Sequence, residues 1–590
     1  MAEVRSYSQG RHHASSWSCR ILQARDSAQH RDLIASVRRV RNSVHGFLAR
    51  FDPNDDPGAD RLTPTVLLVF LAALSMSIWM WLRWKYQPMQ DLGHHVALAA
   101  IVADYGRAHS LYTALYDPID PIAANSLMYE VAGHLGRFIG VTAAVRACVV
   151  FYLVGFPLAT LYALRVFGRS AWGAVLAVPM SYNMVFVAGF VNMLVAVPFM
   201  ILSVALFYRA LDLPNWKRTL SAAVAITLLF LAHAHLFLWT GFLLFLTTLA
   251  LLLGETTRSG VSPRNRLHAV AIRAAVALSA VTPALVFLWL WYRRTFEDPQ
   301  AIAHPEGATA GWHDHFGATF RTVRGAMDTL SASFDLFGSQ NTAGFDDLRW
   351  LFLAIAVGVA LTRLHRYRRP PVFELAFGLT AVSYFMLPTG LKSHDIVAER
   401  QVSVALWLLP AMASPVPAHV SRLGRWVAIA LILAIAALML RSWYGNLVHF
   451  EETEAIGLDW VMKGAPPRLR LHYVKLDTSS AYFAWSPFAH VEKIYMGDAL
   501  GQTPDTSGIL STSAILYKKG VEIHRIGDHS PDWPNNTEIW QNFDLVLTRR
   551  WRPTRAQKDV AERRGKLLRK MGDWELWTSN EATPIESVPH

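Results

Sequence analysis

Residues Ser170 to Leu211 read SAWGAVLAVPMSYNMVFVAGFVNMLVAVPFMILSVALFYRAL, a stretch that is almost entirely apolar. One helix crosses a membrane with about 20 residues at about 1.5 Å per residue, so a run of about 40 would project far beyond the hydrocarbon. The sequence Gly189-Phe-Val-Asn192 interrupts the run near its middle. The stretch therefore predicts a hairpin of two helices.

A second run, Leu220 to Leu253, has the same pattern and is interrupted by His233-Ala-His235. The composition of the whole chain is typical of a membrane protein, since 53% of the residues are hydrophobic and only 17% are charged. We expect about eleven transmembrane helices, several of them short. They comprise the four helices of the two hairpins and the apolar runs Thr65–Leu82, Val145–Phe167, Ala271–Trp291, Trp350–Leu361, Val372–Leu387, Val402–Ala413 and Val427–Trp443.

Basic residues fall in alternate loops between these runs. Loops with an excess of Arg and Lys stay in the cytoplasm, so the open ends of both hairpins are predicted to be cytoplasmic and their tips to lie on the opposite side. The net charge of +12 follows from this topology and does not indicate nucleic-acid binding. The basic residues concerned are Arg165, Arg169, Lys217, Arg218, Arg258, Arg264, Arg266, Arg273, Arg363, Arg366, Arg368, Arg369, Arg422 and Arg425.

The chain is expected to have three parts. The first, residues 1–62, is basic, with nine Arg and no Lys among its first 60 residues, and it lacks an apolar core for a signal peptide, which predicts a cytosolic segment. Residues 63–445 form the membrane domain. Residues 446–590 predict a small periplasmic α/β domain, with strands near Leu469–Val474 and Phe543–Leu547 and a helix over Pro553–Arg569. The fold class is thus a polytopic α-helical membrane protein of a bacterial inner membrane with an extracytoplasmic α/β domain.

Polar residues near the predicted membrane gather on the outer side, where they are expected to face a cavity or one another. Asp91 follows the first crossing, and its carboxylate suits removal of a proton from an acceptor hydroxyl. Arg400 and Lys392 suit a phosphate leaving group, Arg with the better bidentate geometry. The other candidate substrate-binding residues are His94, His95, Asn192, His233, His235 and His394.

Most of these residues also have a simpler structural interpretation. Asp91 precedes a helical segment and is suited to capping it. Arg400 follows Glu399, a sequence that also fits an ordinary ion pair at the membrane surface. The two histidine pairs fit either local hydrogen bonds or a metal ion, and Asn192 fits the cap of a tight turn. The sequence leaves these alternatives open.

The order of the features resembles the GT-C superfamily of integral-membrane glycosyltransferases. The resemblance rests on Asp91 in the first outer loop, on an amphipathic stretch that continues to Tyr105, and on a late outer loop with a basic residue. Similarity to a group of bacterial GT-C-like proteins adds four segments. These are Gly189-Phe-Val-Asn192, His233-Ala-His-Leu-Phe237, the loop from Pro388-Thr-Gly390 to Glu399-Arg400, and Gly572-Asp-Trp-Glu-Leu-Trp577.

The resemblance implies a GT-C-like membrane domain and a sugar donor linked to polyprenyl phosphate, with Asp91 as the superfamily's acidic residue of the first loop. Many members carry paired acids there, whereas this chain has Gln90-Asp91. A divalent metal, Mg²⁺ or Mn²⁺, would therefore need Asp104 or Glu130 as a second carboxylate ligand.

The expected function is transfer of a sugar from this lipid-linked donor to an envelope glycan, lipid or protein at the outer face of the membrane. The expected partners are the donor and membrane lipids. Two other functions stay open: a transporter or flippase for a lipid-linked intermediate, and a GT-C-like scaffold without catalysis. A transporter would show internal repeats or charged residues in mid-membrane, and the sequence shows no convincing instance of either.

Overall fold

The structure is a computed structural model that describes residues 63–107, 110, 112–256, 262–294, 371–387, 398–413, 421–463, 465–483, 486–499 and 530–582. All of them belong to one compact unit, Gly58–His590. Several predictions lie outside the described residues, namely those for the basic segment 1–62, the apolar run at Trp350–Leu361, and the candidate site residues Lys392 and His394.

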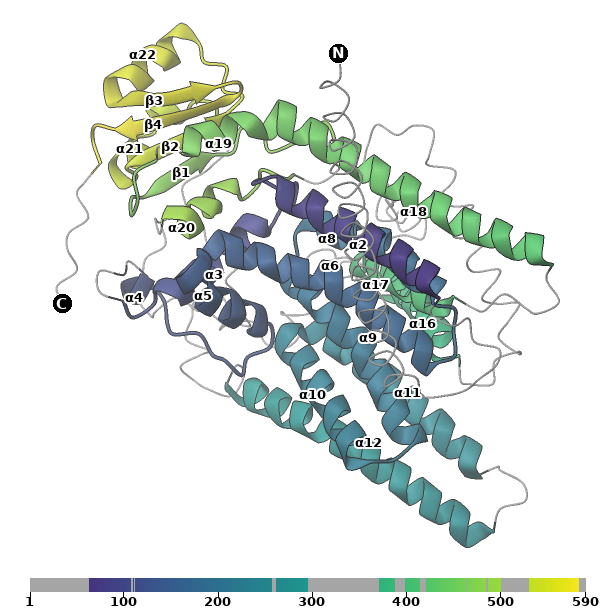
Figure 1. The fold of residues 1–590 in the computed structure, drawn as a ribbon. Coiled ribbons are helices and arrows are strands. Elements are labelled where there is room, and N and C mark those ends of the chain that lie inside the picture. Colours follow the sequence, from purple (N-terminus) through teal and green to yellow (C-terminus); the bar gives the residue numbers. More distant parts are fainter. Residues whose placement is uncertain are drawn as a thin grey trace, which may run out of the picture. The chain divides into compact units, whose positions relative to one another are not determined.

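Long apolar helices make up the larger part of the described chain (Figure 1). Six of them are long and apolar enough to cross a membrane, while the total of about eleven crossings stays a prediction. Thr63, Ser262 and Ser421 each begin one of these helices by accepting a hydrogen bond from a backbone N–H of its first turn. The six are α2 (Pro64–Arg83), α6 (Val141–Val166), α9 (Val191–Asp212), α11 (Ala234–Thr256), α12 (Pro263–Tyr292) and α18 (Arg422–Phe450).

The first predicted hairpin turns where the sequence indicated, at Gly189, which adopts a left-handed conformation with φ of 80°. Its first arm is not one continuous helix, however. It consists of α7 (Trp172–Met180) and the five-residue α8 (Met184–Ala188). Asn183 causes the break, because its side chain accepts the N–H groups of the first turn of α8.

The second predicted hairpin is confirmed, and each of its two arms is one continuous helix. Helix α10 (Trp216–Ala232) ends one residue before the predicted interruption, and α11 begins at Ala234. The Nδ1 atom of His233 accepts a hydrogen bond from the Leu236 backbone N–H at 3.4 Å. His233 thus acts as the N-cap of α11.

Shorter helices lie between the long ones. Helix α3 (Leu92–Asp104), predicted to be amphipathic, is instead buried at nearly every position. The amphipathic helix is α5 (Leu127–Ile139), which exposes Val131, Leu135 and Phe138 on one face. The remaining short elements of this region are α4 (Tyr112–Leu115), α16 (Val372–Met386), α17 (Arg400–Leu408) and the 3₁₀ turn η4 (Leu409–Met412).

The C-terminal part contains a four-stranded sheet of order β1-β2-β4-β3 (Figure 1). Strand β1 (Leu471–Val474) pairs in parallel with β2 (Leu545–Arg549), and the two predicted strands are thus confirmed. The predicted helix over Pro553–Arg569 is α22 (Arg555–Arg564), which ends where β3 (Gly565–Met571) begins. Gly572, at φ of 57°, then turns the chain into β4 (Trp574–Ser579).

Helical turns surround this sheet. The expected boundary at residue 446 lies inside a continuous helical segment, because α18 passes directly into η5 (Glu451–Ala455) and α19 (Ile456–Met462). The other turns are η6 (Val491–Lys493), α20 (Ile494–Ala499), η7 (Trp533–Asn535) and α21 (Thr537–Asn542).

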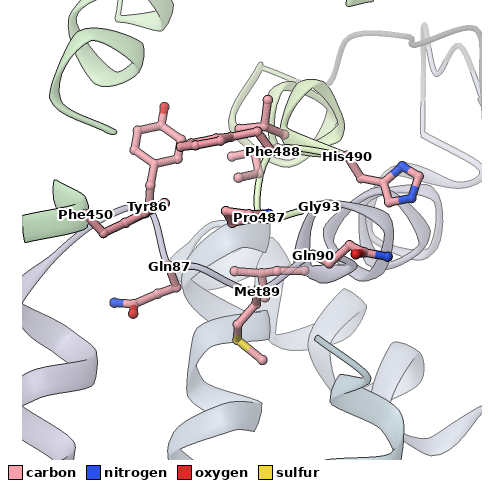
Figure 2. A pocket seen from close by; sticks show the side chains of 12 residues that line it. Tyr86, Gln87, Met89, Gln90, Gly93, Phe450, Pro487, Phe488 and His490 are labelled. Carbon is pink, nitrogen blue, oxygen red and sulfur yellow. The ribbon is translucent and has the colours of Figure 1, made fainter. Parts of the chain in front are cut away.

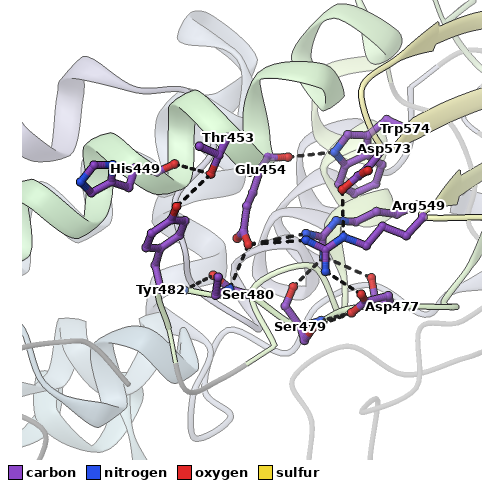
Figure 3. Close-up of polar contacts among 12 residues, drawn as sticks. His449, Thr453, Glu454, Asp477, Ser479, Ser480, Tyr482, Arg549, Asp573 and Trp574 are labelled. Atoms are coloured by element: carbon purple, nitrogen blue, oxygen red, sulfur yellow. Dashed lines mark hydrogen bonds and ion pairs between the residues drawn. The ribbon is translucent and has the colours of Figure 1, made fainter. Parts of the chain in front are cut away.

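A buried arginine joins the sheet to the helical turn η5, which continues from α18 (Figure 3). Arg549 of β2 is fully buried, donates to the Ser479 carbonyl at 2.6 Å, and lies 3.8 Å from the Glu454 carboxylate. Its guanidinium carbon also lies 4.1 Å from the ring centroid of Phe488. Arg549 therefore fixes the chain segment that leads to residues 486–499, which we call the docking segment.

Candidate functional site

Asp91 is held by the tip of the first hairpin. The backbone N–H groups of Gln90 and Asp91 donate to the carbonyls of Val187 and Ala188 at 2.9 and 3.1 Å. Gly189 is required here, because a Cβ atom at this position would lie 2.7 Å from the Asp91 nitrogen. Asp91 occupies the N-cap position of α3, but its side chain makes no capping hydrogen bond. Its carboxylate is therefore available for another role.

Groups from two distant parts of the chain surround this carboxylate. The Nε2 atom of His490 lies 3.7 Å from Asp91 Oδ1. Burial raises the pKa of Asp91 to about 6, against the opposing effects of the Lys493 charge, a hydrogen bond from Gln90, and the Arg400 charge. A carboxylate with this pKa is ionised at neutral pH and is still a useful base.

Lys493 is completely buried, and its Nζ atom lies 3.4 Å from the Nδ1 atom of His94. Burial, followed by the charge of Lys493, lowers the pKa of His94 well below its usual value. His94 is therefore neutral, so that its ring nitrogen can accept a hydrogen bond from the ammonium group. The predicted site residue His94 thus pairs with a lysine 399 positions away.

The docking segment packs directly on α3. A Cβ atom at Gly93 would overlap the carbonyl oxygen of His490, and one at Gly497 would overlap the side chain of Val96. The Ser486 N–H donates to Gln90 Oε1 at 3.3 Å. These close approaches place His490 and Lys493 at the Asp91 site. Sequence reasoning missed both residues, because no local motif distinguishes them.

The tips of both hairpins meet the start of α17, as the topology predicted. The guanidinium of Arg400 lies over the ring of Phe190, 4.5 Å from its centroid. His235 Nε2 lies 2.8 Å from the side-chain nitrogen of Gln401. The second hairpin therefore contributes His235 to the surroundings of Arg400.

The other predicted residues have local structural contacts. His95 is buried, and its Nδ1 atom lies 2.8 Å from the Tyr129 hydroxyl, which ties α3 to α5. Asn192 accepts a hydrogen bond from the adjacent Met193 N–H at 2.8 Å. His233 caps α11, as described above. His95 and His233 thus position helices around the site, whereas the Asn192 bond is local to the start of α9.

Comparison with known proteins adds a likeness in fold. No family model and no curated protein match the chain. Among solved structures, it is similar to ArnT from Cupriavidus metallidurans bound to undecaprenyl phosphate, with a TM-score of 0.51 and 13% identity over 88% of this chain and 99% of that one. The chain has a GT-C-like fold. The apo structure of the same ArnT gives a TM-score of 0.49 at 15% identity over the same shares of the two chains.

The carboxylates proposed for a metal are not brought together in this GT-C-like fold. Asp104 lies at the far end of α3, about 20 Å from Asp91 at about 1.5 Å per residue. It lies 3.6 Å from Arg468, while Glu130 pairs with His134 at 2.9 Å. Within the described ranges, no three His, Cys, Asp or Glu side chains are arranged to hold a metal ion. These residues therefore do not fit a Mg²⁺ or Mn²⁺ site.

A small pocket is lined by the two sequence neighbours of Asp91, Gln90 and Leu92, and by residues that include Phe488 and His490 of the docking segment (Figure 2). Its volume is only about 10 Å³. A larger cleft of about 250 Å³ shares three lining residues with it, Tyr86, Val491 and Ile494. The cleft is also lined by Lys85, Met462, Lys463, Ala465, Tyr495, Asp498 and Ala499. The cleft thus adjoins the small pocket.

Proposed function

We propose that this protein transfers a sugar from a polyprenyl-phosphate-linked donor to an acceptor hydroxyl at the outer face of a bacterial inner membrane. The observation that carries the proposal is the environment of Asp91. This carboxylate makes no capping hydrogen bond and is surrounded by His490, Lys493 and Arg400 from two other parts of the chain. The GT-C-like fold, shared with an ArnT bound to undecaprenyl phosphate, supports the class of donor.

In the proposed reaction, Asp91 removes the proton from the acceptor hydroxyl as the oxygen attacks the anomeric carbon of the sugar. The bond between this carbon and the phosphate oxygen breaks, and polyprenyl phosphate leaves with the electron pair. Arg400 stabilises the negative charge that develops on the phosphate, since a guanidinium can donate two parallel hydrogen bonds to its oxygens. The proton stays on Asp91 until product release.

The cleft of about 250 Å³ is the proposed approach for the acceptor. Its volume is slightly below the range of about 300 to 1,000 Å³ that is usual for small-molecule sites, so it suits one end of a larger molecule. Tyr86 and Tyr495 give it aromatic surface, and Lys85 and Asp498 give it polar groups. This lining suits a polar acceptor such as a glycan end or lipid headgroup.

The test is an assay of polyprenyl phosphate release by membranes that contain the wild type, Asp91→Asn or Glu130→Gln. We expect Asp91→Asn to lower the rate about 100-fold or more, which is the usual contribution of a general base. Glu130→Gln is the matched control, because Glu130 pairs with His134 on α5. An Asp91→Asn enzyme as active as the wild type would refute the assignment.

A further inference from the structure

Lys493 is an unusual residue for a buried helical turn. It is the last residue of η6 and is completely buried. A buried ammonium group is costly unless an anion or strong hydrogen-bond acceptors surround it. Its neighbour Glu492 is also buried, and burial together with the charge of Glu492 raises the pKa of Tyr473 in strand β1.

Several observations place the Lys493 ammonium group at the Asp91 site. Its Nζ atom lies 3.4 Å from His94 on the first turn of α3. Its charge and that of Arg400 both act on Asp91. The docking segment cannot shift toward α3, because the His490 carbonyl already occupies the space that a side chain at Gly93 would need. Two cations from different parts of the chain are thus held beside one carboxylate.

We propose that Lys493 binds the phosphate of the lipid-linked donor together with Arg400, so that the docking segment completes the phosphate site. This inference rests on the donor class of the proposed function. A phosphodiester donor carries one negative charge, and the polyprenyl phosphate that leaves carries nearly two at neutral pH. A second cation therefore stabilises the leaving group more than the bound donor, which lowers the barrier for transfer.

The proposal gives the C-terminal part a catalytic role. Arg400 supplies a planar, bidentate group, whereas Lys493 supplies a compact charge on a flexible stem. Neutral His94 orients this stem by accepting from the ammonium group. His94 is then a positioning residue, and Lys493 is the residue that touches substrate.

The test compares two probes that differ only in the phosphate group, undecaprenyl phosphate and undecaprenol, in binding to the purified full-length protein. We expect Lys493→Met to weaken binding of undecaprenyl phosphate about 10- to 100-fold, as is usual for a lost hydrogen bond to a charged group. Binding of undecaprenol should change by less than about twofold, and Lys493→Arg should keep most of the preference for the phosphate. Lys558→Met is the control, because Lys558 is an exposed lysine of α22.

Three outcomes would overturn the inference. If Lys493→Met weakens the binding of both probes equally, Lys493 contributes only to the stability of the fold. If the variant keeps the wild-type preference for the phosphate, the assignment of Lys493 fails and the donor class stands. If the wild type binds both probes equally, the donor class of the proposed function fails as well.

A measurement on the wild type covers the case in which Lys493→Met does not fold. Amide hydrogen exchange of the docking segment is followed by mass spectrometry in the presence of each probe. Undecaprenyl phosphate, and not undecaprenol, is expected to protect residues 486–499 from exchange. Equal protection by both, or by neither, would contradict the proposal.

Discussion

The His490 Nε2 atom lies 3.7 Å from the Asp91 Oδ1 atom, which joins the docking segment to the residue that precedes α3. The contact closes one side of the Asp91 site and leaves the carboxylate largely removed from water. Removal from water destabilises the ionised form of Asp91. The Asp91 carboxylate is therefore a stronger base than the carboxylate of an exposed aspartate.

The first prediction concerns the pH dependence of transfer. The pKa of Asp91 is raised to about 6, and the base must be ionised to accept a proton. We expect kcat/KM to be constant above pH 7 and to fall about tenfold per pH unit well below pH 6. Tryptophan fluorescence at each pH verifies that the protein stays folded. A rate that is unchanged between pH 7.5 and pH 5 would contradict the role of Asp91.

The second prediction concerns stability. The pKa of Asp91 in the folded protein lies above its value of 3.8 in an unfolded chain, so the folded state binds more protons between about pH 4 and pH 6. The free energy of unfolding therefore falls as the pH rises through this window. We expect Asp91→Asn to raise this free energy by about 1 to 3 kcal/mol at pH 7.5. Thermal unfolding at pH 7.5 and pH 4 measures the effect, and a gain that is equal at both pH values would argue against ionisation as its cause.

The third prediction concerns the contact between Gly93 and His490. Gly93→Ala places a methyl group against the His490 carbonyl, so either α3 or the docking segment must move. We expect a loss of about 1 to 3 kcal/mol in stability and a larger proportional loss of transfer rate, because His490 and Lys493 shift with the segment. Gly241→Ala in α11 is the control, since a Cβ atom there meets nothing within 4 Å. Wild-type activity and stability in Gly93→Ala would show that the contact is absent in solution.

The fourth prediction concerns Arg549. Its removal leaves the Glu454 carboxylate and the Ser479 carbonyl without a buried cation, so Arg549→Leu should lower the free energy of unfolding by about 3 kcal/mol or more. Arg549→Lys should recover only part of this loss, because lysine lacks the fork that reaches both groups. Arg555→Leu, at an exposed position of α22, is the control. Limited proteolysis near residues 477–490 follows the local effect, and an unchanged cleavage rate in Arg549→Leu would refute it.

Several features of this protein could be predicted from local sequence. The reversal at Gly189 and the break before Ala234 both interrupt apolar runs too long for a single crossing, and the structure has them at those positions. Strands β1 and β2 were also indicated by their alternating residues. Such features depend on segment length, on left-handed glycine and on side-chain periodicity, which are properties of neighbouring residues.

The partners of the charged residues, in contrast, are known only from the tertiary structure. Arg169 was predicted to lie in a cytoplasmic loop, and the structure shows it buried and donating to Glu374 of α16 at 2.9 Å. Asp104 was a candidate metal ligand, and it lies beside Arg468 instead. A charged residue in a sequence shows its sign and its approximate side of the membrane, whereas its partner depends on which segments pack together.

The sequence by itself determined the two hairpin turns and singled out Asp91 as the acidic residue of the first outer loop. Only the tertiary structure placed His490 and Lys493 beside it, through the packing of the docking segment against Gly93. The physical reason is the separation along the chain between the residues that interact. Turns and helices arise from interactions within a few residues, but a site for a charged ligand needs groups that long-range packing brings together from opposite ends of the chain.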